Sequence, residues 1–304
     1  MKTLLIILAS VTGLAIVAEI GLRITTGLGN PPLYVADAEI GYLLAPNQKL
    51  RRFGNSIQTN QYSMRSQEIA AKSEDQRRIL LLGDSVVNGS WWTDEAETLS
   101  SLLANQLNNS GDVEVLNASA NSWGPRNELA YLKRYGLFDA DALVLVINTD
   151  DLFATEPTSL AVGKSYSYPD RAPVLAVVEL YQLFIAPPKS IPELDRLKQV
   201  KDDRLSKNLA AIKAIKAIAD TNNTKFVLAL TPLLREFEEG STDKELVARN
   251  RLQQLVITEK ISYLDFLEIW ADFPQPEFLY RDRIHPSPQG NSKIVEAIAE
   301  RITN

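Results

Sequence analysis

The sequence predicts an α/β fold in three layers, a five-stranded parallel β-sheet between helices, preceded by an apolar N-terminal helix and a short β-rich segment. Two observations predict it. The 304 residues are 45% hydrophobic and 23% charged, the composition of an ordinary globular protein. Beyond residue 77, short apolar runs typical of buried strands alternate with amphipathic helical segments, as they do where parallel strands are joined by crossover helices.

The N-terminal segment, residues 1–26, contains an uncharged apolar run at 4–18. Those fifteen residues rise only ~23 Å as a helix, against a hydrocarbon core of ~30 Å, but continuing through Glu19 to Leu22 nearly reaches that length. We therefore expect a signal anchor, with the rest of the chain bound to a membrane on its periplasmic or extracellular side. A signal peptide cleaved after Ala18, which would release a secreted protein, is the alternative.

Residues 27–73 are rich in Pro, Asn and Gly, with short apolar pieces at 40–44 and 56–59 that predict strands. This segment is expected to form a β-rich lead-in to the main domain, residues 74–304.

The main domain contains five predicted strands and five predicted helices in alternation. Continuous apolar runs predict the strands, and amphipathic spacing or capping signals predict the helices. The strands are expected at 78–83, 113–116, 142–147, 225–230 and 262–266, and the helices at 94–107, 127–135, 204–220, 242–256 and 288–302.

One long segment, residues 151–203, interrupts this alternation. It is rich in Pro and Tyr and carries an apolar helical piece at 174–184. Following the third strand, it is expected either to cover the site as a lid or to pack on the flank of the domain.

The first strand of the sheet ends in Gly83-Asp84-Ser85. A serine in a tight strand-to-helix turn presents its hydroxyl at the carboxyl edge of a parallel sheet, where ligands bind in such folds. A serine hydroxyl becomes a useful nucleophile only when a neighbouring base takes its proton, and a carboxylate must orient that base.

His285, the single histidine of the chain, follows Asp282 by three residues. Both precede the last helix, which places them at the same edge of the sheet as Ser85. The sequence therefore predicts a Ser85–His285–Asp282 triad, with a structural helix-capping role for His285 as the alternative.

Composition excludes several other kinds of site. The chain has no Cys and one His, so thiolate and multi-histidine metal sites are excluded, and no phosphate loop or dinucleotide fingerprint is present. Neither a metal nor a cofactor is expected. The formal charge of −6 without a basic block argues against a nucleic-acid partner.

These residues resemble the GDSL/SGNH hydrolases, a family of esterases and lipases with a flavodoxin-like fold. The first family block, Gly-Asp-Ser with a glycine soon after, is matched by residues 83–85 and Gly89, and the last block, Asp-x-x-His, by residues 282–285. The resemblance covers roughly residues 77–304 and implies Ser85 as nucleophile, His285 as base and Asp282 as orienter. Residues 19–23 (EIGLR) also resemble the flank of membrane-anchored members.

The middle blocks depart from the family pattern. The family's oxyanion-hole glycine corresponds by count to Ser122, and Gly124 is the nearest glycine. The family's amide donor, the Asn of Gly-x-Asn-Asp, corresponds to Asp150. Because an ionised carboxylate repels an oxyanion, Asp150 must be protonated, turned away, or replaced as donor by Asn148.

The resemblance implies a serine-dependent hydrolase of ester bonds, acting on a small molecule, a lipid or an acylated glycan. An O-acyltransferase that acts on an envelope glycan and a non-catalytic envelope binding protein with the same fold are the alternatives.

Overall fold

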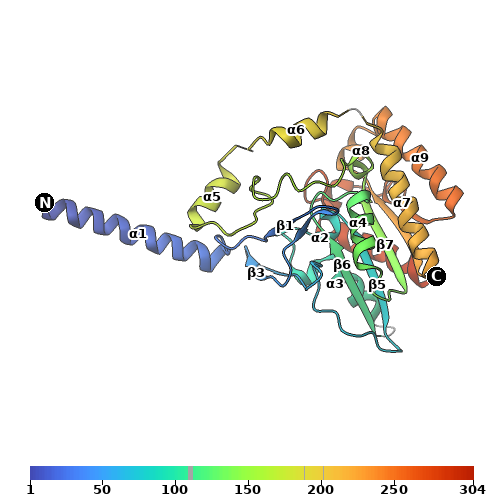
Figure 1. The fold of residues 1–304 in the computed structure, drawn as a ribbon, viewed down its shortest axis with the longest axis horizontal. Helices are drawn as coiled ribbons and strands as arrows, with labels where there is room; N and C mark the ends of the chain where they lie inside the picture. Colours follow the sequence, from blue (N-terminus) through green and yellow to red (C-terminus); the bar gives the residue numbers. More distant parts are fainter. Residues whose placement is uncertain (109–111, 188, 201) are drawn as a thin grey trace.

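The structure is a computed structural model that describes residues 1–108, 112–187, 189–200 and 202–304 (Figure 1). Its centre is a parallel sheet of five strands in the order β6-β5-β7-β8-β9, which confirms the predicted architecture. The strands are β5 (Arg77–Gly83), β6 (Val113–Ser119), β7 (Ala142–Asn148), β8 (Lys225–Thr231) and β9 (Ser262–Asp265).

Helices cover both faces of the sheet. Leu80 and Leu82 of β5 belong to an apolar core shared with α4 (Pro125–Tyr135), α7 (Arg204–Thr221) and α9 (Asp243–Glu259). Ile79 and Leu81, which alternate with them, belong to the opposite core with α3 (Leu99–Leu107) and α11 (Pro288–Thr303). This alternation explains why β5 reads as a continuous apolar run, since both faces of the strand are buried.

Several element boundaries differ from the prediction by a few residues, and capping residues explain two of the differences. The helix expected from residue 94 begins at Leu99, because Asp94 caps a separate 3-10 turn, Glu95–Glu97, and Thr98 caps α3. The strand expected to reach Phe266 ends at Asp265, whose side chain accepts a hydrogen bond from Leu267 N and begins α10 (Phe266–Ile269).

The lead-in consists of two antiparallel hairpins. β1 (Tyr34–Asp37) pairs with β2 (Gly41–Leu44), and β3 (Lys49–Arg52) pairs with β4 (Asn55–Gln58). The sequence predicted one strand of each pair. The first hairpin is fixed to the main domain by Trp123, whose indole Nε1 donates to Tyr42 O at 3.0 Å.

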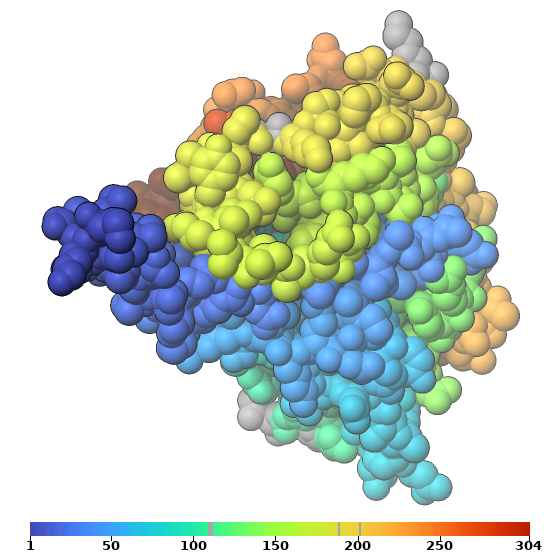
Figure 2. Space-filling model, turned by 60° about the vertical axis from the view of Figure 1, so that its left-hand side comes forward, coloured from blue at the N-terminus to red at the C-terminus, as the bar shows by residue number. Residues whose placement is uncertain are grey.

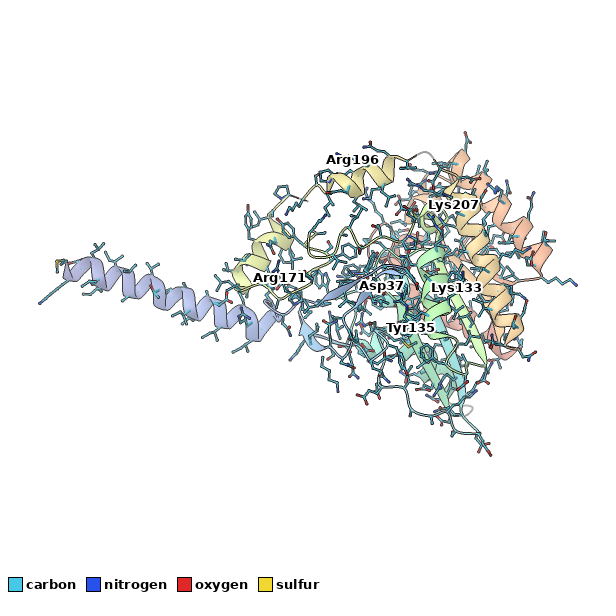
Figure 3. The ribbon with its side chains drawn as sticks, in the orientation of Figure 1. Asp37, Lys133, Tyr135, Arg171, Arg196 and Lys207 are labelled. Atoms are coloured by element: carbon cyan, nitrogen blue, oxygen red, sulfur yellow. The ribbon has the colours of Figure 1, made fainter. Side chains whose placement is uncertain are left out.

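The N-terminal helix α1 (Lys2–Thr26) projects away from the rest of the molecule (Figure 1). It is long and apolar enough to cross a membrane, and none of its residues is buried. Figure 3 shows that its side chains project into free space over most of its length.

Residues 151–203 run along one side of the carboxyl edge of the sheet. They contain a 3-10 turn that begins at Thr149 (Thr149–Phe153), α5 (Ala176–Phe184) and α6 (Pro192–Gln199). Figure 2 shows this yellow-green and yellow part of the chain bordering a hollow in the surface, with α1 in dark blue beside it. The remaining short helices are α2 (Ser85–Asn88), α8 (Leu234–Glu238) and the 3-10 turn Pro276–Leu279.

Candidate active site

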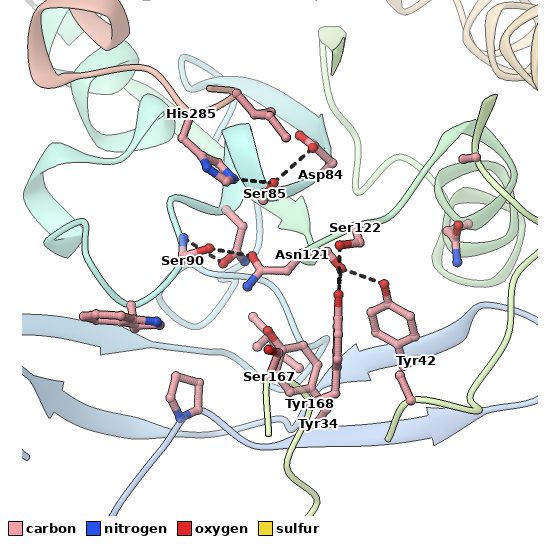
Figure 4. A pocket seen from close by; sticks show the side chains of 18 of the residues that line it. Tyr34, Tyr42, Asp84, Ser85, Ser90, Asn121, Ser122, Ser167, Tyr168 and His285 are labelled. Atoms are coloured by element: carbon pink, nitrogen blue, oxygen red, sulfur yellow. Dashed lines mark hydrogen bonds between the residues drawn. The ribbon is translucent and has the colours of Figure 1, made fainter. Parts of the chain in front are cut away.

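The turn that carries Ser85 forms where β5 ends. A Cβ added at Gly83 would lie 2.4 Å from Val146 O and 2.5 Å from Val87 Cγ2, so only glycine allows the strand to pass this close to β7. Asp84 then caps α2, accepting a hydrogen bond from Val86 N at 2.8 Å. This arrangement leaves the side chain of Ser85 at the first position of α2, facing the pocket (Figure 4).

Ser85, His285 and Asp282 form a continuous hydrogen-bonded chain. Ser85 Oγ lies 2.9 Å from His285 Nε2 (Figure 4). On the other side of the imidazole, His285 Nδ1 lies 2.8 Å from Asp282 Oδ2. Ser85 Oγ is also 3.1 Å from Asp84 Oδ2. Because a hydroxyl has one proton, the contact with His285 is the one that allows the histidine to take it.

The loop that carries His285 is fixed on both sides. Arg281 N donates to His285 O at 2.8 Å, and Ser287 N donates to Leu279 O at 2.9 Å. Ser287 caps α11, with its Oγ accepting from Gly290 N at 3.2 Å. A Cβ at Gly290 would lie 2.1 Å from Leu279 O, so the glycine is required for this close approach.

Asp282, the carboxylate in contact with His285 Nδ1, remains accessible to solvent. Its side chain is 46% exposed, against 18% for His285. Partial burial acts to raise its pKa, but the backbone N–H groups of His285 and Ile284, at 2.9 and 2.8 Å, and the imidazole hold that pKa below its ordinary value. Asp282 is therefore ionised over the whole neutral range, as a partner of an imidazolium must be.

Asn148, at the end of β7, does not point a free amide at the nucleophile. Its Nδ2 donates to Asp84 Oδ2 at 2.8 Å, and its Oδ1 accepts from Asp150 N at 2.8 Å. Asp84 thus receives hydrogen bonds from Asn148 Nδ2 and Val86 N, and its Oδ2 also lies 3.1 Å from Ser85 Oγ. Burial raises the pKa of Asp84, while the hydrogen bond from Val86 N, the nearby His285 and the contacts with Ser85 act to lower it. The sequence analysis missed this role of Asp84, because it depends on contacts between two strands.

The backbone N–H groups of Ser122 and Gly124 differ in whether they already donate a hydrogen bond within the described residues. Ser122 has a φ of 59°, in the left-handed region that favours glycine, which agrees with its correspondence to a family glycine. No hydrogen bond among the described residues engages its backbone N–H. The Gly124 N–H donates to Asn127 Oδ1 at 3.1 Å as part of the cap of α4, so it is occupied.

Asp150 lines the same pocket as Ser85, and its side chain makes no hydrogen bond among the described residues. Partial burial, followed by the nearby charge of Glu245, raises its pKa, although Arg235 acts to lower it. Among the described residues, no ion pair or hydrogen bond turns the Asp150 carboxyl away from the pocket. Its effect on a negative charge formed near Ser85 therefore depends on whether the carboxyl is protonated.

The pocket over Ser85 has a volume of about 680 Å³. Three tyrosines form one wall, with ring centroids 5.1 to 6.0 Å apart: Tyr34 and Tyr42 from the lead-in and Tyr168 from the 151–203 segment. Tyr168 OH donates to Ser122 Oγ at 2.8 Å (Figure 4). The 151–203 segment therefore contributes directly to the pocket.

Trp92 forms the wall beside the histidine, with ring centroids 5.0 Å apart and an edge-to-face arrangement. The guanidinium of Arg281 lies 5.3 Å from the centre of the same indole. Trp91 and Trp92 both line the pocket and contact each other. Both indoles therefore form part of the pocket wall.

Arg65 supports the nucleophile turn from behind and was not identified from the sequence. It is buried, and its guanidinium donates to the carbonyl oxygens of Asn88, Ser90 and Thr93, each at 2.5 Å. The lead-in therefore stabilises the loop that follows Ser85. No local sequence pattern marks this arginine, since its partners lie more than 20 residues away.

A group of buried carboxyls lies behind the site. Burial, reinforced by the charge of Asp84, raises the pKa of both Glu128 and Asp151 well above the ordinary value. Neither Glu128 side-chain oxygen has a hydrogen-bond partner among the described residues. Within that same part of the chain, no cluster of three or more His, Asp or Glu side chains is arranged to hold a metal ion.

Comparison with known proteins gives matches at the level of family and fold. A model of the GDSL-like lipase/acylhydrolase family matches residues 81–293. A search of the curated proteins found no match. Among solved structures, the chain is similar to the α/β hydrolase LAE5 from the metagenome of Lake Arreo, Spain, at 14% identity and a TM-score of 0.50, covering 75% of this chain and 95% of that one. It is also similar to the acetyl xylan esterase AlAXEase, at 13% identity and a TM-score of 0.50, covering 74% and 99%. At these identities the likeness shows a shared fold.

Proposed function

Because the chain belongs to the GDSL-like lipase/acylhydrolase family, we propose that it hydrolyses ester bonds with Ser85 as the nucleophile, His285 as the general base and Asp282 as its orienter. The observation that carries this proposal is the 2.9 Å distance between Ser85 Oγ and His285 Nε2. That distance lies within the ~2.6–3.2 Å range in which a base can remove the proton of a nucleophile.

The proposed reaction has two halves. His285 Nε2 takes the proton of Ser85 as Oγ attacks the ester carbonyl carbon, and the imidazolium then gives that proton to the departing alcohol oxygen. The acyl group is left on Ser85. In the second half, His285 removes a proton from water, the resulting hydroxide attacks the acyl carbon, and the proton returns to Ser85 Oγ as the carboxylic acid leaves. Asp282 stabilises the imidazolium in both halves.

The negative charge on the carbonyl oxygen requires hydrogen-bond donors. Ser122 is the best candidate of the two positions predicted from the second family block, because no hydrogen bond within the described part of the chain engages its N–H, whereas the Gly124 N–H donates to Asn127. Tyr168 supports the Ser122 side chain from the opposite wall. The Asn148 side chain, which donates to Asp84, acts in this proposal by positioning the nucleophile turn.

The size and lining of the pocket support a substrate larger than a short ester. About 680 Å³ lies within the range typical of small-molecule sites and accommodates a lipid chain or one or more sugar units. The aromatic and polar walls are compatible with either, so the proposed substrate class is an ester of a lipid or of an acylated glycan.

The proposal also places the hydrolase at a membrane. Residues 4–18 of α1 expose an uncharged apolar surface, which is stable in lipid and not in water. The helix continues without a break past Ala18 to Thr26. This continuity favours a retained anchor over cleavage, with the catalytic domain outside the cytoplasm, and N-terminal sequencing of the membrane-extracted protein tests it.

The catalytic proposal is tested with p-nitrophenyl esters of increasing chain length and three proteins: the unmodified chain, Ser85→Ala and His285→Ala. Both variants should lose at least ~10³-fold in kcat, since each removes a participant in proton transfer or bond formation. Circular dichroism should show that both remain folded. Activity retained by folded His285→Ala would remove the histidine from the mechanism.

A further inference from the structure

Helix α5 has its polar and apolar sides reversed relative to an ordinary surface helix. A stripe of large apolar side chains at helical spacing faces outward: Val174, Val177, Val178, Tyr181, Phe184 and Ile185. Phe184 is 60% and Ile185 69% exposed. In a water-soluble domain such a stripe normally faces the core, so its outward direction requires an explanation.

The charged residue of α5 faces inward. Glu179 is buried, and its two oxygens accept hydrogen bonds from Arg52 Nη2 and Gly29 N, both at 2.5 Å. Arg52 Nη1 also donates to Gly27 O at 2.7 Å. This buried ion pair fixes the rotation of α5 about its own axis. The apolar stripe is thus held outward by the fold and is not a consequence of a loosely attached helix.

The beginning of α5 is attached to the end of the apolar run of α1. Glu19 accepts hydrogen bonds from Ala176 N at 2.7 Å and Val177 N at 3.2 Å, where α5 starts. Arg23 donates to Val174 O at 2.8 Å and pairs with Glu19 at 2.7 Å. The part of α1 from Lys2 to Glu19 rises about 27 Å, close to the thickness of a hydrocarbon core. α5 therefore starts at the depth where the hydrocarbon region would end.

We propose that the outer face of α5 rests on the lipid bilayer that α1 spans, at the boundary between headgroups and acyl chains. This inference rests on the membrane anchoring proposed above. The partner is the lipid surface itself. Three arginines lie at the level assigned to the lipid headgroups. Arg23 and Arg51 line a hollow of about 210 Å³, and Arg171 lies beside α5 (Figure 3). Their positive charges suit an interaction with lipid phosphates.

This placement connects the bilayer to the active site. A series of aromatic contacts leads inward from α5, with ring centroids 6.2 Å apart for Phe184 and Phe53, 5.1 Å for Phe53 and Trp91, and 5.5 Å for Trp91 and Trp92. Trp92 contacts His285. Glu179 and Leu183 of α5 themselves line the pocket. The mouth of the pocket would therefore lie at the membrane surface, where an ester held in the bilayer can enter it.

The experiment uses the absence of cysteine in the chain. Single substitutions Val177→Cys and Tyr181→Cys receive an environment-sensitive nitrobenzoxadiazole label in the full-length protein, which is then reconstituted into phosphatidylcholine–phosphatidylglycerol vesicles. Quenching by lipids with a doxyl group near the headgroup reports contact with the bilayer. Leu14→Cys in α1 tests the anchor. Leu246→Cys, an equally exposed apolar position on α9, is the matched control.

We expect the labels at 177 and 181 to be quenched at least threefold more than the label at 246. Quenching at 177 and 181 as weak as at 246, with strong quenching at 14, would overturn the placement of α5 and leave the anchor intact. Absence of quenching at 14 would overturn both. Each labelled protein is also assayed on a water-soluble p-nitrophenyl ester, so that a failure of the catalytic proposal is recognised separately.

Discussion

The Asn148 side chain, at the end of β7, donates a hydrogen bond of 2.8 Å to the Asp84 carboxylate, at the end of β5. Asp84 in turn caps the short helix that begins with Ser85. The position of the nucleophile thus depends on a contact between two neighbouring strands as well as on the turn itself. Both side chains are almost fully buried, which makes the contact sensitive to any loss of a partner.

Replacing Asp84 by Ala should lower both stability and activity. The variant leaves the Asn148 amide and Val86 N without their acceptor in a buried site, at a cost of about 1–3 kcal/mol for each unpaired group. Urea unfolding should show a loss of about 2–4 kcal/mol, and kcat on a p-nitrophenyl ester should fall while KM changes little. Asp272→Ala, at an exposed position, is the control. Unchanged stability of Asp84→Ala would contradict the positioning role.

Replacing Asp282 by Ala should reduce kcat less than replacing His285. The Asp282 side chain is 46% exposed, so water partly replaces its stabilisation of the imidazolium. We expect a loss on the order of 10²–10³-fold for Asp282→Ala, against a larger loss for His285→Ala. Steady-state kinetics on one ester compare the two variants directly. Equal losses would show that Asp282 does more than orient an accessible histidine.

Asp150→Asn should raise kcat, and the gain should depend on pH. The pKa of Asp150 is raised by partial burial, so the carboxyl is protonated in acid and gains its charge as pH rises through that pKa. The charge opposes an oxyanion, whereas the neutral amide of Asn does not. We expect a gain equivalent to about 1–3 kcal/mol of transition-state stabilisation at alkaline pH, with a smaller gain in acid.

The test of this prediction is a pH–rate profile for Asp150→Asn beside the unmodified chain, with Asn148→Ala measured in parallel. A fall in kcat for Asp150→Asn at alkaline pH would contradict the prediction. A loss of kcat in Asn148→Ala is expected in either case, because this variant removes the hydrogen bond to Asp84 that positions the turn carrying Ser85.

Glu128→Gln should become relatively more stable than the unmodified chain as pH rises. Burial, with the charge of Asp84, holds the pKa of Glu128 well above its ordinary value of 4.5, so the folded state keeps the proton after the unfolded state has lost it. The unmodified chain then loses stability above about pH 4.5, by up to about 1.4 kcal/mol per pH unit, until the folded pKa is reached. Glutamine has no such dependence.

Urea unfolding of both proteins between pH 4 and pH 8 measures this effect as the difference between their free energies of unfolding. The difference should be smallest near pH 4 and increase towards pH 8. A difference that stays constant with pH would show that Glu128 ionises normally in the folded protein.

Much of the fold follows from local sequence patterns. The apolar runs that became β5 and β7 are buried on both faces, which is why they carry no alternation and were recognised as parallel strands. The order of the elements then places Ser85 and His285 at one edge of the sheet, although 200 residues separate them. Sequence reasoning anticipates this proximity because the carboxyl ends of parallel strands meet at the same edge.

The contacts that surround the site were not predictable in the same way. Arg65 binds carbonyl groups of a loop more than 20 residues away, and Tyr168 reaches Ser122 from a separate segment. An acidic residue on a helix near the surface is expected to face solvent, yet Glu179 pairs with Arg52 in the interior. Each depends on which side chains the completed fold brings together, and no local period or motif encodes that.

The most direct test of the central claim, that Ser85 is an activated nucleophile, is covalent labelling by a fluorophosphonate followed by mass spectrometry of the labelled peptide. The hydrogen bond between Ser85 Oγ and His285 Nε2 predicts one phosphonyl group per chain, attached to Ser85, with labelling abolished in Ser85→Ala and strongly slowed in His285→Ala. Absence of label above the Ser85→Ala background in the folded, unmodified chain would contradict the account and favour a binding protein that keeps the fold without the chemistry.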